Sequence, residues 1–380
     1  MLRDVRSMEI FACKLFRIMH VNLIQMGEKM NKTKKKVAII GHFGGNKAFF
    51  DGQTVKTKVL YQELQKKDYS VYKVDTYYKK KNLIKLLWQT TVCLFFHKHI
   101  FVLLSIEGMK IYFPLLHFIS KIKNIKIYHD VIGGNLEDII RKHPKFVKYL
   151  NSFRVNWVET NGIKQSVEKL GVRNVSVLPN FKDLDAVVLE DVSSYELSDN
   201  GYDFCTFSRV IRQKGITDAI NSIAEINAKR GKIIARLNIY GPVEDDYKDE
   251  FNELTAKYDD FVSYRGVVES QNSVQALKWY YALLFPTRWH GEGFPGTILD
   301  CYASAIPVIA SDWSANKEIV VHGKTGIIYP CDEIKTLTEA IEWAIDNKDK
   351  MDAMKIACRN EYEKYTPEHV MAVINQKLME

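Results

Sequence analysis

The chain has 380 residues, of which 46% are hydrophobic and 12% aromatic, and this composition excludes disorder as the dominant state. The length favours two domains over one. The formal net charge of +8 is uneven, because residues 31–185 carry 28 Lys and Arg against 12 Asp and Glu, whereas residues 186–380 carry 21 against 31. The basic half predicts an anionic partner, either nucleic acid or a membrane surface, although lysines can also serve solubility alone.

The first 29 residues differ from the rest of the chain. Met30 begins a basic lead into the first apolar run, so residues 1–29 are expected to be an upstream extension or an amphipathic membrane-surface segment. Lys14, Arg17 and His20 interrupt their apolar run, which argues against a signal peptide. No uncharged apolar stretch reaches the length of a membrane-spanning helix. The six cysteines lack CxxC and metal-ligand spacing, which favours a reduced, cytoplasmic protein.

Short apolar runs alternate with amphipathic segments through residues 30–181, which predicts a doubly wound α/β domain. The predicted strands are 37–41, 71–74, 100–104, 125–129, 156–160 and 175–179, and 54–66 is a predicted helix. A loop with Gly44, Gly45 and Gly52 follows the first strand; its backbone is able to approach a diphosphate, or it is a simple turn. His129 ends a predicted strand, where a single histidine is more often structural.

Two aromatic and apolar segments, 83–96 and 111–119, are flanked by lysines. Lys79, Lys80 and Lys81 precede the first segment, and Lys121 and Lys123 follow the second. This composition is typical of a segment that lies on a membrane without crossing it, and equally of core helices packed on a sheet. We expect one face to be buried and the other to meet an anionic membrane surface.

Residues 182–200 are polar and acidic and are a predicted linker. Residues 201–360 repeat the α/β pattern and predict a second doubly wound domain. The predicted strands are 203–208, 236–240, 262–264, 282–285 and 307–310, and the predicted helices are 216–229, 247–257, 273–280, 297–304 and 337–347. Residues 361–380 are expected to form a C-terminal helix. One possibility is that this helix crosses back to the first domain.

The stretch from Pro286 to Asp300 predicts a glycine-rich turn and the start of a helix. Free backbone N–H groups at a helix start bind anions. The carboxylates of Glu292 and Asp300 suit hydroxyl groups instead, so together the two features indicate a nucleotide sugar. Thr297 and Asp300 also match a capping box, in which case Asp300 stabilises the helix without touching a ligand.

Two basic residues bracket the loop after the predicted strand 203–208. Arg209 and Lys214 lie where both side chains could reach one pyrophosphate at the carboxyl edge of the sheet, and Arg could do so bidentately. The alternative is that both are solvated loop charges.

The spacing from Glu292 to Asp300, with Lys317-Glu-Ile-Val320 and Gly323-Lys-Thr-Gly326, resembles the Glu-x7-Glu donor-site signature of glycosyltransferase family 4. Asp300 is one methylene shorter than the usual second acid. The resemblance implies an α/β GT-B fold, with two Rossmann-like domains that face a central cleft. It also implies a retaining enzyme that moves a sugar from a nucleoside diphosphate to a glycan or polyprenyl-diphosphate-linked glycan, as in capsule or O-antigen synthesis.

The resemblance further implies roles for single residues. Arg209 and Lys214 would bind the donor phosphates, although Ser208 replaces the usual glycine before Arg209. Glu292 would contact the transferred sugar and Asp300 the ribose. The donor site would also include Gly293, Phe294 and Gly296 in the turn, where Pro295 removes one amide. From the first domain, His129 would lie beside the sugar, and Gly44, Gly45 and Gly52 would lie at the diphosphate. Glu318 is a further candidate, although Ser314-Ala315-Asn316 precedes it in place of the usual Gly-Gly.

No cofactor and no metal are expected, because no cluster of residues has ligand spacing and because cationic side chains usually replace the metal in this fold class. We expect the protein at the inner face of the cell membrane, attached peripherally. The alternatives are an inactive nucleotide-sugar-binding protein and another GT-B enzyme such as a sugar-nucleotide epimerase. A nucleic-acid-binding protein is a weaker alternative, because no recognised binding motif accompanies the basic charge.

Overall fold

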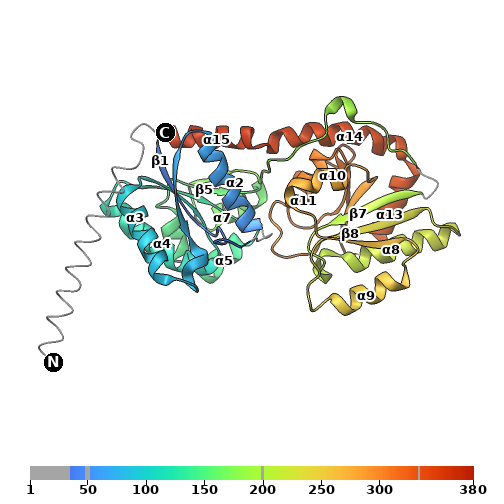
Figure 1. The fold of residues 1–380 in the computed structure, drawn as a ribbon, viewed down its shortest axis with the longest axis horizontal. Helices are drawn as coiled ribbons and strands as arrows, with labels where there is room; N and C mark the ends of the chain where they lie inside the picture. Colours follow the sequence, from blue (N-terminus) through green and yellow to red (C-terminus); the bar gives the residue numbers. More distant parts are fainter. Residues whose placement is uncertain (1–34, 48–51, 198–200, 333) are drawn as a thin grey trace, which may run out of the picture. The chain divides into compact units, whose positions relative to one another are not determined.

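The computed structural model describes residues 35–47, 52–197, 201–332 and 334–380 (Figure 1). The segment 1–29, for which the sequence suggested an extension or a membrane-surface helix, lies outside these residues. The chain forms two compact units, one made of residues up to Val131 with Lys145–Asn156, the other of Ile132–Pro144 with Trp157–Glu380. Within the described residues, no helix combines the length and the apolar character that crossing a bilayer requires.

The first sheet has six strands in the order β2-β1-β3-β4-β5-β6. They are β1 (Lys36–Gly41), β2 (Ser70–Asp75), β3 (His99–Leu103), β4 (Lys126–Asp130), β5 (Val155–Val158) and β6 (Val175–Val177). Strand β1 pairs in parallel with both β2 and β3, so the strand order reverses between β1 and β3. Ligands of open α/β sheets bind at the carboxyl ends of the strands where the order reverses.

Helices connect the strands of the first sheet. They are α2 (Gly52–Lys66), α3 (Leu83–Phe96), α4 (Ile106–Ile122), α5 (Leu136–Lys142), α6 (Phe146–Leu150) and α7 (Asn161–Lys169). Helices α3 and α4 contain the two lysine-flanked segments. Each buries one face, represented by Leu86 on α3 and Phe113 on α4, and exposes large apolar side chains on another, such as Ile84 and Phe118. The expected burial of one face is therefore confirmed, whereas contact of the other face with a membrane surface stays a prediction.

The second sheet has the order β12-β11-β10-β7-β8-β9, and all its pairs are parallel. Its strands are β7 (Tyr202–Phe207), β8 (Ala235–Tyr240), β9 (Val262–Gly266), β10 (Ala282–Phe285), β11 (Val308–Ser311) and β12 (Gly326–Tyr329). The first strand, β7, lies beside β10, so the order reverses between these two strands. The loops that follow β7 and β10 therefore leave the sheet side by side.

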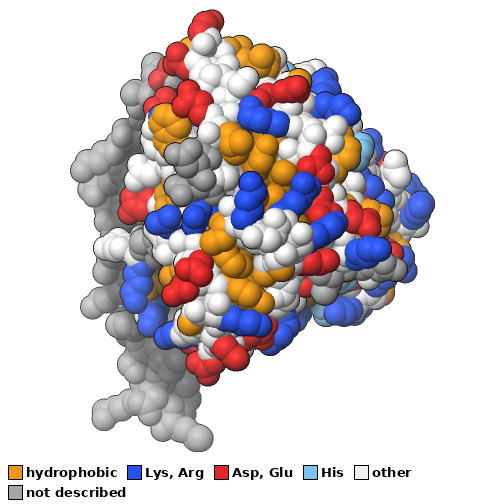
Figure 2. Space-filling model, turned by 90° about the vertical axis from the view of Figure 1, so that its right-hand side faces the viewer, with side chains coloured by type: hydrophobic (Ala, Val, Ile, Leu, Met, Phe, Trp, Pro, Cys, Tyr) orange, Lys and Arg blue, Asp and Glu red, His pale blue; other side chains and the backbone are white. Residues whose placement is uncertain are grey.

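The helices of the second half are α8 (Ile216–Arg230), α9 (Lys248–Lys257), α10 (Ser273–Leu277), α11 (Gly296–Ala303), α12 (Asn316–Ile319), α13 (Ile334–Asp346), α14 (Lys348–Tyr362) and α15 (Pro367–Met379). Ion pairs join α8 to α13 at the surface, between Lys229 and Glu342 at 2.7 Å and between Arg230 and Asp346 at 2.8 Å. Figure 2 shows basic and acidic side chains interspersed over the face that lies to the right in Figure 1. The negative charge of residues 186–380 is thus interrupted by basic side chains on this face.

Candidate functional site

The loop between β10 and α11 contains one half of a buried ion pair. Nζ of Lys214 donates a hydrogen bond to Oε2 of Glu292 over 2.5 Å, and Oγ1 of Thr287 donates to the same oxygen over 3.0 Å. Both charged residues are only 8% exposed. Lys214 ends the short 3-10 helix Arg212–Lys214 in the loop after β7. Because β7 and β10 are neighbours, the fold brings together two residues that are 78 positions apart.

Gly215 fixes the backbone beside Lys214. Its φ is +72°, and a Cβ atom at this position would lie 2.3 Å from the carbonyl oxygen of Pro286. Only glycine allows both the left-handed backbone and this approach. The turn after β7 therefore packs directly against the beginning of the loop that carries Glu292.

Burial lowers the pKa of Lys214, because the ammonium has lost most of its contact with water. The carboxylate of Glu292 opposes this effect, and the nearby charge of Arg209 adds to it. A further negative charge beside this poorly solvated ammonium would stabilise its charged form. The pair is therefore suited to receive an anionic ligand.

Arg209 lies in the same loop but remains open to solvent, with its side chain 46% exposed. Its guanidinium pairs with Glu244 over 2.7 Å and lies 5.0 Å from the ring centroid of Trp289, which belongs to the loop after β10. A cation–π contact of this kind holds the guanidinium near the loop while leaving its N–H groups accessible. Arg209 thus adds a positive charge near Lys214, and the predicted contact of both side chains with one pyrophosphate stays a prediction.

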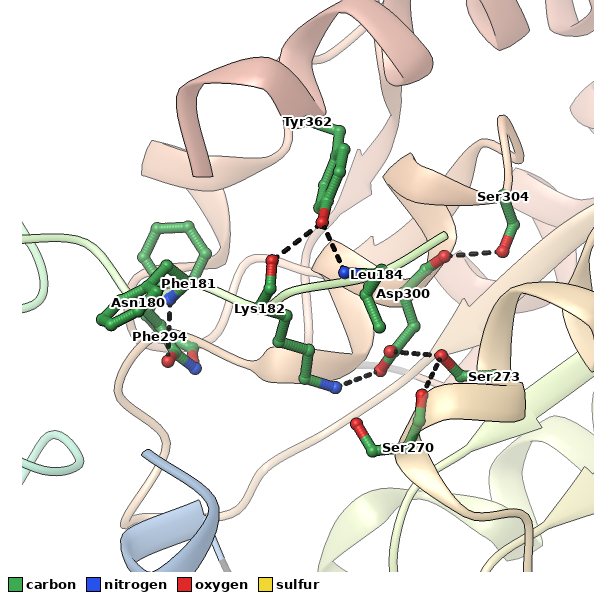
Figure 3. Close-up of polar contacts among 10 residues, drawn as sticks. All are labelled: Asn180, Phe181, Lys182, Leu184, Ser270, Ser273, Phe294, Asp300, Ser304 and Tyr362. Atoms are coloured by element: carbon green, nitrogen blue, oxygen red, sulfur yellow. Dashed lines mark hydrogen bonds and ion pairs between the residues drawn. The ribbon is translucent and has the colours of Figure 1, made fainter. Parts of the chain in front are cut away.

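Asp300 is buried in helix α11 and paired with a residue that the sequence did not single out (Figure 3). Its Oδ2 lies 2.5 Å from Nζ of Lys182, and its Oδ1 accepts a hydrogen bond from Oγ of Ser273 over 2.8 Å. Only 1% of Asp300 is exposed, and burial raises its pKa while Lys182 opposes the rise. The second acid of the motif therefore holds an ammonium group in place.

The capping box at Thr297 and Asp300 is wrong. Helix α11 begins at Gly296, and its N-cap residue, Pro295, offers no side-chain acceptor. The Oγ1 of Thr297 is buried and has no hydrogen-bond partner among the described residues. Because the helix starts earlier than the motif requires, Thr297 falls inside the first turn and Asp300 turns toward Lys182 and Ser273 instead.

The glycine-rich turn before α11 lies against a third carboxylate. The backbone N–H of Phe294 donates to Oε2 of Glu159 over 2.9 Å, and a Cβ atom on Gly293 would lie 2.4 Å from that oxygen. The amide of Phe294, which the sequence predicted to face a phosphate, thus already binds an anionic group. Gly296 begins α11, and a Cβ atom there would lie 2.9 Å from Cε of Lys182. The start of α11 is therefore next to an ammonium group.

Glu318 is used at a different helix. Its two carboxylate oxygens accept hydrogen bonds from the N–H groups of Asn161 and Gly162, over 2.8 and 2.7 Å, at the start of α7. A carboxylate at a helix N-terminus is favoured by the helix dipole and by the unpaired amides. This contact gives Glu318 a structural role at the start of α7. The predicted contact of Glu318 with the donor is not needed to explain its position.

The glycine loop after β1 is held by a carboxylate of its own unit. The N–H groups of Phe43 and Gly45 donate to Asp75 over 2.9 and 2.8 Å, and both Gly44 and Gly45 have positive φ. Gly52 is the first residue of α2 and is exposed. Asp75 ends β2, so this arrangement favours the simple turn over the predicted contact with a diphosphate.

His129 lies in the core of the first unit. It is 0% exposed, and its ring packs edge-on against Phe113 and Phe153. Its Nδ1 lies 3.0 Å from Oδ1 of Asn156, so Nδ1 carries the proton. Its buried Nε2 has no partner among the described residues. Burial lowers the pKa of His129 to about 4, and this environment favours a core histidine over a ligand contact.

The buried His129 should make the stability of the protein depend on pH. Its pKa is about 4 in the fold and near 6.5 when unfolded, so between these values the unfolded chain binds more protons. This contribution is fully present above pH 6.5 and should fall by roughly 2–3 kcal/mol between pH 7.5 and 4.5. Urea unfolding at both pH values should show that His129→Gln removes this part of the loss. The same change at exposed His369 is the control, and an equal pH effect in both variants would contradict the assignment.

Four residues of this region were missed by the sequence analysis: Lys182, Ser273, Thr287 and Glu159. Lys182 and Ser273 lie in segments that carried no motif, so only the fold reveals them. Glu159 follows β5 directly, and an acidic residue at the carboxyl end of a parallel strand could have been noted as a site candidate. Within the part of the chain that the structure describes, no group of three or more His, Cys, Asp or Glu residues could hold a metal ion.

Comparison with known proteins finds a family match in the second half of the chain. The family model described as "Glycosyl transferases group 1" matches residues 201–347. The lipopolysaccharide core biosynthesis mannosyltransferase LpsB of Rhizobium meliloti is 39% identical over 80 residues, which are 20% of this chain and 22% of LpsB. The capsular polysaccharide biosynthesis glycosyltransferase CapM of Staphylococcus aureus is 28% identical over 172 residues, 43% of this chain and 42% of CapM. The matches thus span less than half of these relatives.

Solved structures resemble the chain over most of its length. Sucrose-phosphate synthase from Thermosynechococcus elongatus has a TM-score of 0.71 at 13% identity, covering 91% of this chain and 99% of the synthase. The lipopolysaccharide outer core galactosyltransferase WaaB has a TM-score of 0.67 at 18% identity, covering 90% and 99%. These likenesses confirm the predicted GT-B fold. Residues 201–347 are therefore similar to the group 1 glycosyltransferases, and this match confirms the predicted resemblance to glycosyltransferase family 4.

Proposed function

We propose that the chain is a retaining glycosyltransferase that moves a hexose-type sugar from a nucleoside diphosphate to a glycan or lipid-linked glycan in surface polysaccharide synthesis. The observation that carries this proposal is the buried pair of Lys214 and Glu292 where the loops after β7 and β10 meet. Open α/β sheets bind their ligands at such an edge. The names of the lipopolysaccharide and capsule relatives support the same class of reaction.

The chemistry would be mainly electrostatic. As the acceptor oxygen bonds to the anomeric carbon, the bond from that carbon to the diphosphate breaks, and negative charge grows on the leaving phosphate. An ammonium has three N–H donors, so Lys214 can keep its bond to Glu292 and still donate to the phosphate. Arg209 supplies a second cation. Donors placed where the charge develops stabilise the transition state. The leaving phosphate would take the proton of the acceptor hydroxyl, as the family resemblance implies.

Glu292 would orient the sugar. Among the described residues, both hydrogen bonds to its carboxylate fall on Oε2, which leaves Oε1 for a sugar hydroxyl. Asp300 would act through Lys182, because a side chain that is 1% exposed and paired over 2.5 Å offers little surface to a ribose. The Lys182 ammonium lies beside the start of α11, where a phosphate would be favoured.

The role of Asp300 can be tested by comparing it with its partner. Asp300→Asn and Lys182→Met are each expected to weaken UDP binding at least tenfold, because either change removes the ammonium from its place, and a charged hydrogen bond contributes about 1.5–3 kcal/mol. Isothermal titration measures the affinity. Ser273→Ala is the control, since it keeps the ion pair. If Lys182→Met binds UDP as wild type while Asp300→Asn does not, Asp300 contacts the nucleotide directly.

A panel of sugar nucleotides tests the proposed activity. The Anabaena protein Alr3699/HepE, with a TM-score of 0.66, was solved in complex with UDP-glucose, and the pneumococcal O-GlcNAc transferase GtfA, with 0.56, in complex with UDP and GlcNAc. These relatives support UDP sugars as the first to try. A specific donor should stabilise the protein by roughly 2–3 kcal/mol at a hundredfold excess over its Kd, in a thermal shift.

The same panel separates the alternatives. Release of free UDP on addition of an acceptor distinguishes transfer from mere binding, and a changed sugar nucleotide without acceptor indicates an epimerase. Each arm is run with EDTA and with Mg²⁺, because we assign the neutralisation of the diphosphate to Arg209 and Lys214 rather than to a metal. Stabilisation by none of the UDP, GDP, ADP and dTDP sugars would contradict the proposal.

We further propose that the protein attaches peripherally to the cytoplasmic face of the membrane through α3 and α4. Ile84 is 82% exposed and Phe118 60%, and lysines flank both helices. Each Lys near an anionic leaflet contributes about 1 kcal/mol. We expect sedimentation with phosphatidylserine vesicles at low salt, weaker at high salt, and little with neutral vesicles. Equal recovery in the supernatant under all conditions would exclude this attachment.

A further inference from the structure

The first unit contains a cavity of about 600 Å³, a volume typical of small-molecule sites. Its apolar wall is formed by Leu83, Leu86 and Leu87 of α3 and by Ile111, Tyr112 and Leu115 of α4. Leu86 and Tyr112 are buried, whereas Leu87 and Ile111 are 58% and 61% exposed. Large apolar side chains left this open at a cavity mark a binding surface for an apolar ligand.

The other end of the cavity is polar and lies at the carboxyl edge of the first sheet. His42 follows β1, Thr76 follows β2 and Ser105 precedes α4 after β3, and all three line the cavity. The chain runs from β1 to β2 and then to β3 on the other side of β1, so the strand order reverses between β1 and β3. This is the place where an open α/β sheet binds its ligand. The cavity therefore runs from the ligand-binding edge of the sheet to an apolar wall between two helices.

The cavity is also positively charged. Lys79, Lys80 and Lys81 line it and all three are exposed, and none of the lining residues that the structure describes is Asp or Glu. Three adjacent ammonium groups beside an apolar wall match a ligand that carries an anionic group at one end of a hydrocarbon chain. A free sugar would meet the polar edge but would leave the apolar wall exposed, so an amphiphile fits better.

We propose that this cavity binds the lipid-phosphate end of a lipid-linked glycan acceptor, with the hydrocarbon chain between α3 and α4 and the phosphate on Lys79, Lys80 and Lys81. The inference rests on the proposed function, of which it specifies the acceptor class. It differs from attachment to a bilayer, because it involves only the side chains that line the cavity. Ile84 and Phe118 are exposed on the same two helices but do not line it.

Farnesyl phosphate, used as a monomer below its micelle concentration, is the probe, and isothermal titration with the full chain measures its Kd. Wild type should bind it at least tenfold more tightly than it binds farnesol or inorganic phosphate. Leu87→Asp and Ile111→Asp should each weaken binding at least tenfold, because a carboxylate would enter the apolar wall. Ile84→Asp and Phe118→Asp are the matched controls on the same helices, and we expect their Kd to stay within twofold of wild type.

The phosphate end is tested separately. Replacing Lys79, Lys80 and Lys81 together by Gln should reduce the affinity for farnesyl phosphate to that for farnesol. Lys121→Gln, an exposed change on α4 outside the cavity, should have no effect. Failure of wild type to bind farnesyl phosphate, or an equal loss in all four aspartate variants, would overturn the proposal; the second result would indicate a general apolar surface.

The two proposals fail separately, because the sugar-nucleotide panel does not involve this cavity. If sugar nucleotides stabilise the protein and free UDP is released with a soluble glycan, but farnesyl phosphate does not bind, the lipid cavity is refuted and the transferase function stands. If farnesyl phosphate binds as described and no sugar nucleotide stabilises the protein, the cavity is a lipid-phosphate site and the proposed function is refuted.

Discussion

Lys214→Met is expected to reduce both stability and turnover strongly. The change leaves the carboxylate of Glu292 buried without its partner, and breaking a buried ion pair from one side costs about 3–5 kcal/mol. Turnover should fall roughly a hundredfold to a thousandfold, because one donor to the leaving diphosphate is lost. Urea unfolding and UDP release with a working donor measure the two effects.

The double variant Lys214→Met with Glu292→Gln separates the two losses. With no charge left in the site, most of the stability should return, whereas turnover should stay low. Lys229→Met is the control for removing a lysine, since its pair with Glu342 lies at the surface and such pairs contribute about 0–1 kcal/mol. If Lys214→Met is as stable as wild type, Glu292 does not depend on Lys214 for its burial.

Arg209→Ala is expected to lose turnover while the fold stays intact. Its side chain is 46% exposed and its pair with Glu244 is a surface pair, so the free energy of unfolding should change by less than about 1 kcal/mol. The loss of a cation facing the diphosphate should lower turnover roughly a hundredfold. Steady-state kinetics with the donor identified by the panel measures the change.

Arg212 provides a matched control from the same loop. It is 65% exposed and pairs with Glu250, as Arg209 pairs with Glu244, but no prediction places it at the donor. Arg212→Ala should keep turnover within threefold of wild type. Equal losses in the two variants would mean that the loop charge as a whole matters, and not the position of Arg209.

Much of the fold could be predicted because the central strands of parallel sheets are continuous apolar runs. The predicted strand 282–285 coincides with β10. The predicted strands 37–41 and 203–208 differ from β1 and β7 by one residue at their ends. The missed elements include the short helices α5, α6, α7 and α12, and also β12 and α14. Gly326–Tyr329 is too short to stand out from its loop, and α14 follows α13 after a single residue, so no break in the sequence separated them.

The candidate site was predictable only in part. Local signals identified Glu292, Arg209 and Lys214, because acidic and basic residues in turns after buried strands are informative on their own. The contact between Lys214 and Glu292 was not predictable, since it depends on β7 lying beside β10, which no local pattern encodes. The pairing of Asp300 with Lys182 escaped prediction for the same reason, and there a cap motif suggested the wrong partner.

The two cations differ in how much water surrounds them, and this has a consequence for the kinetics of ligand capture. Mobile ions screen the exposed Arg209 over a Debye length of about 8 Å at physiological ionic strength, whereas they screen the buried Lys214 far less. Arg209 should therefore accelerate the approach of an anionic ligand, and salt should slow that approach. Lys214 should act only once the ligand has arrived, so that the dissociation rate should respond to salt much less than the association rate.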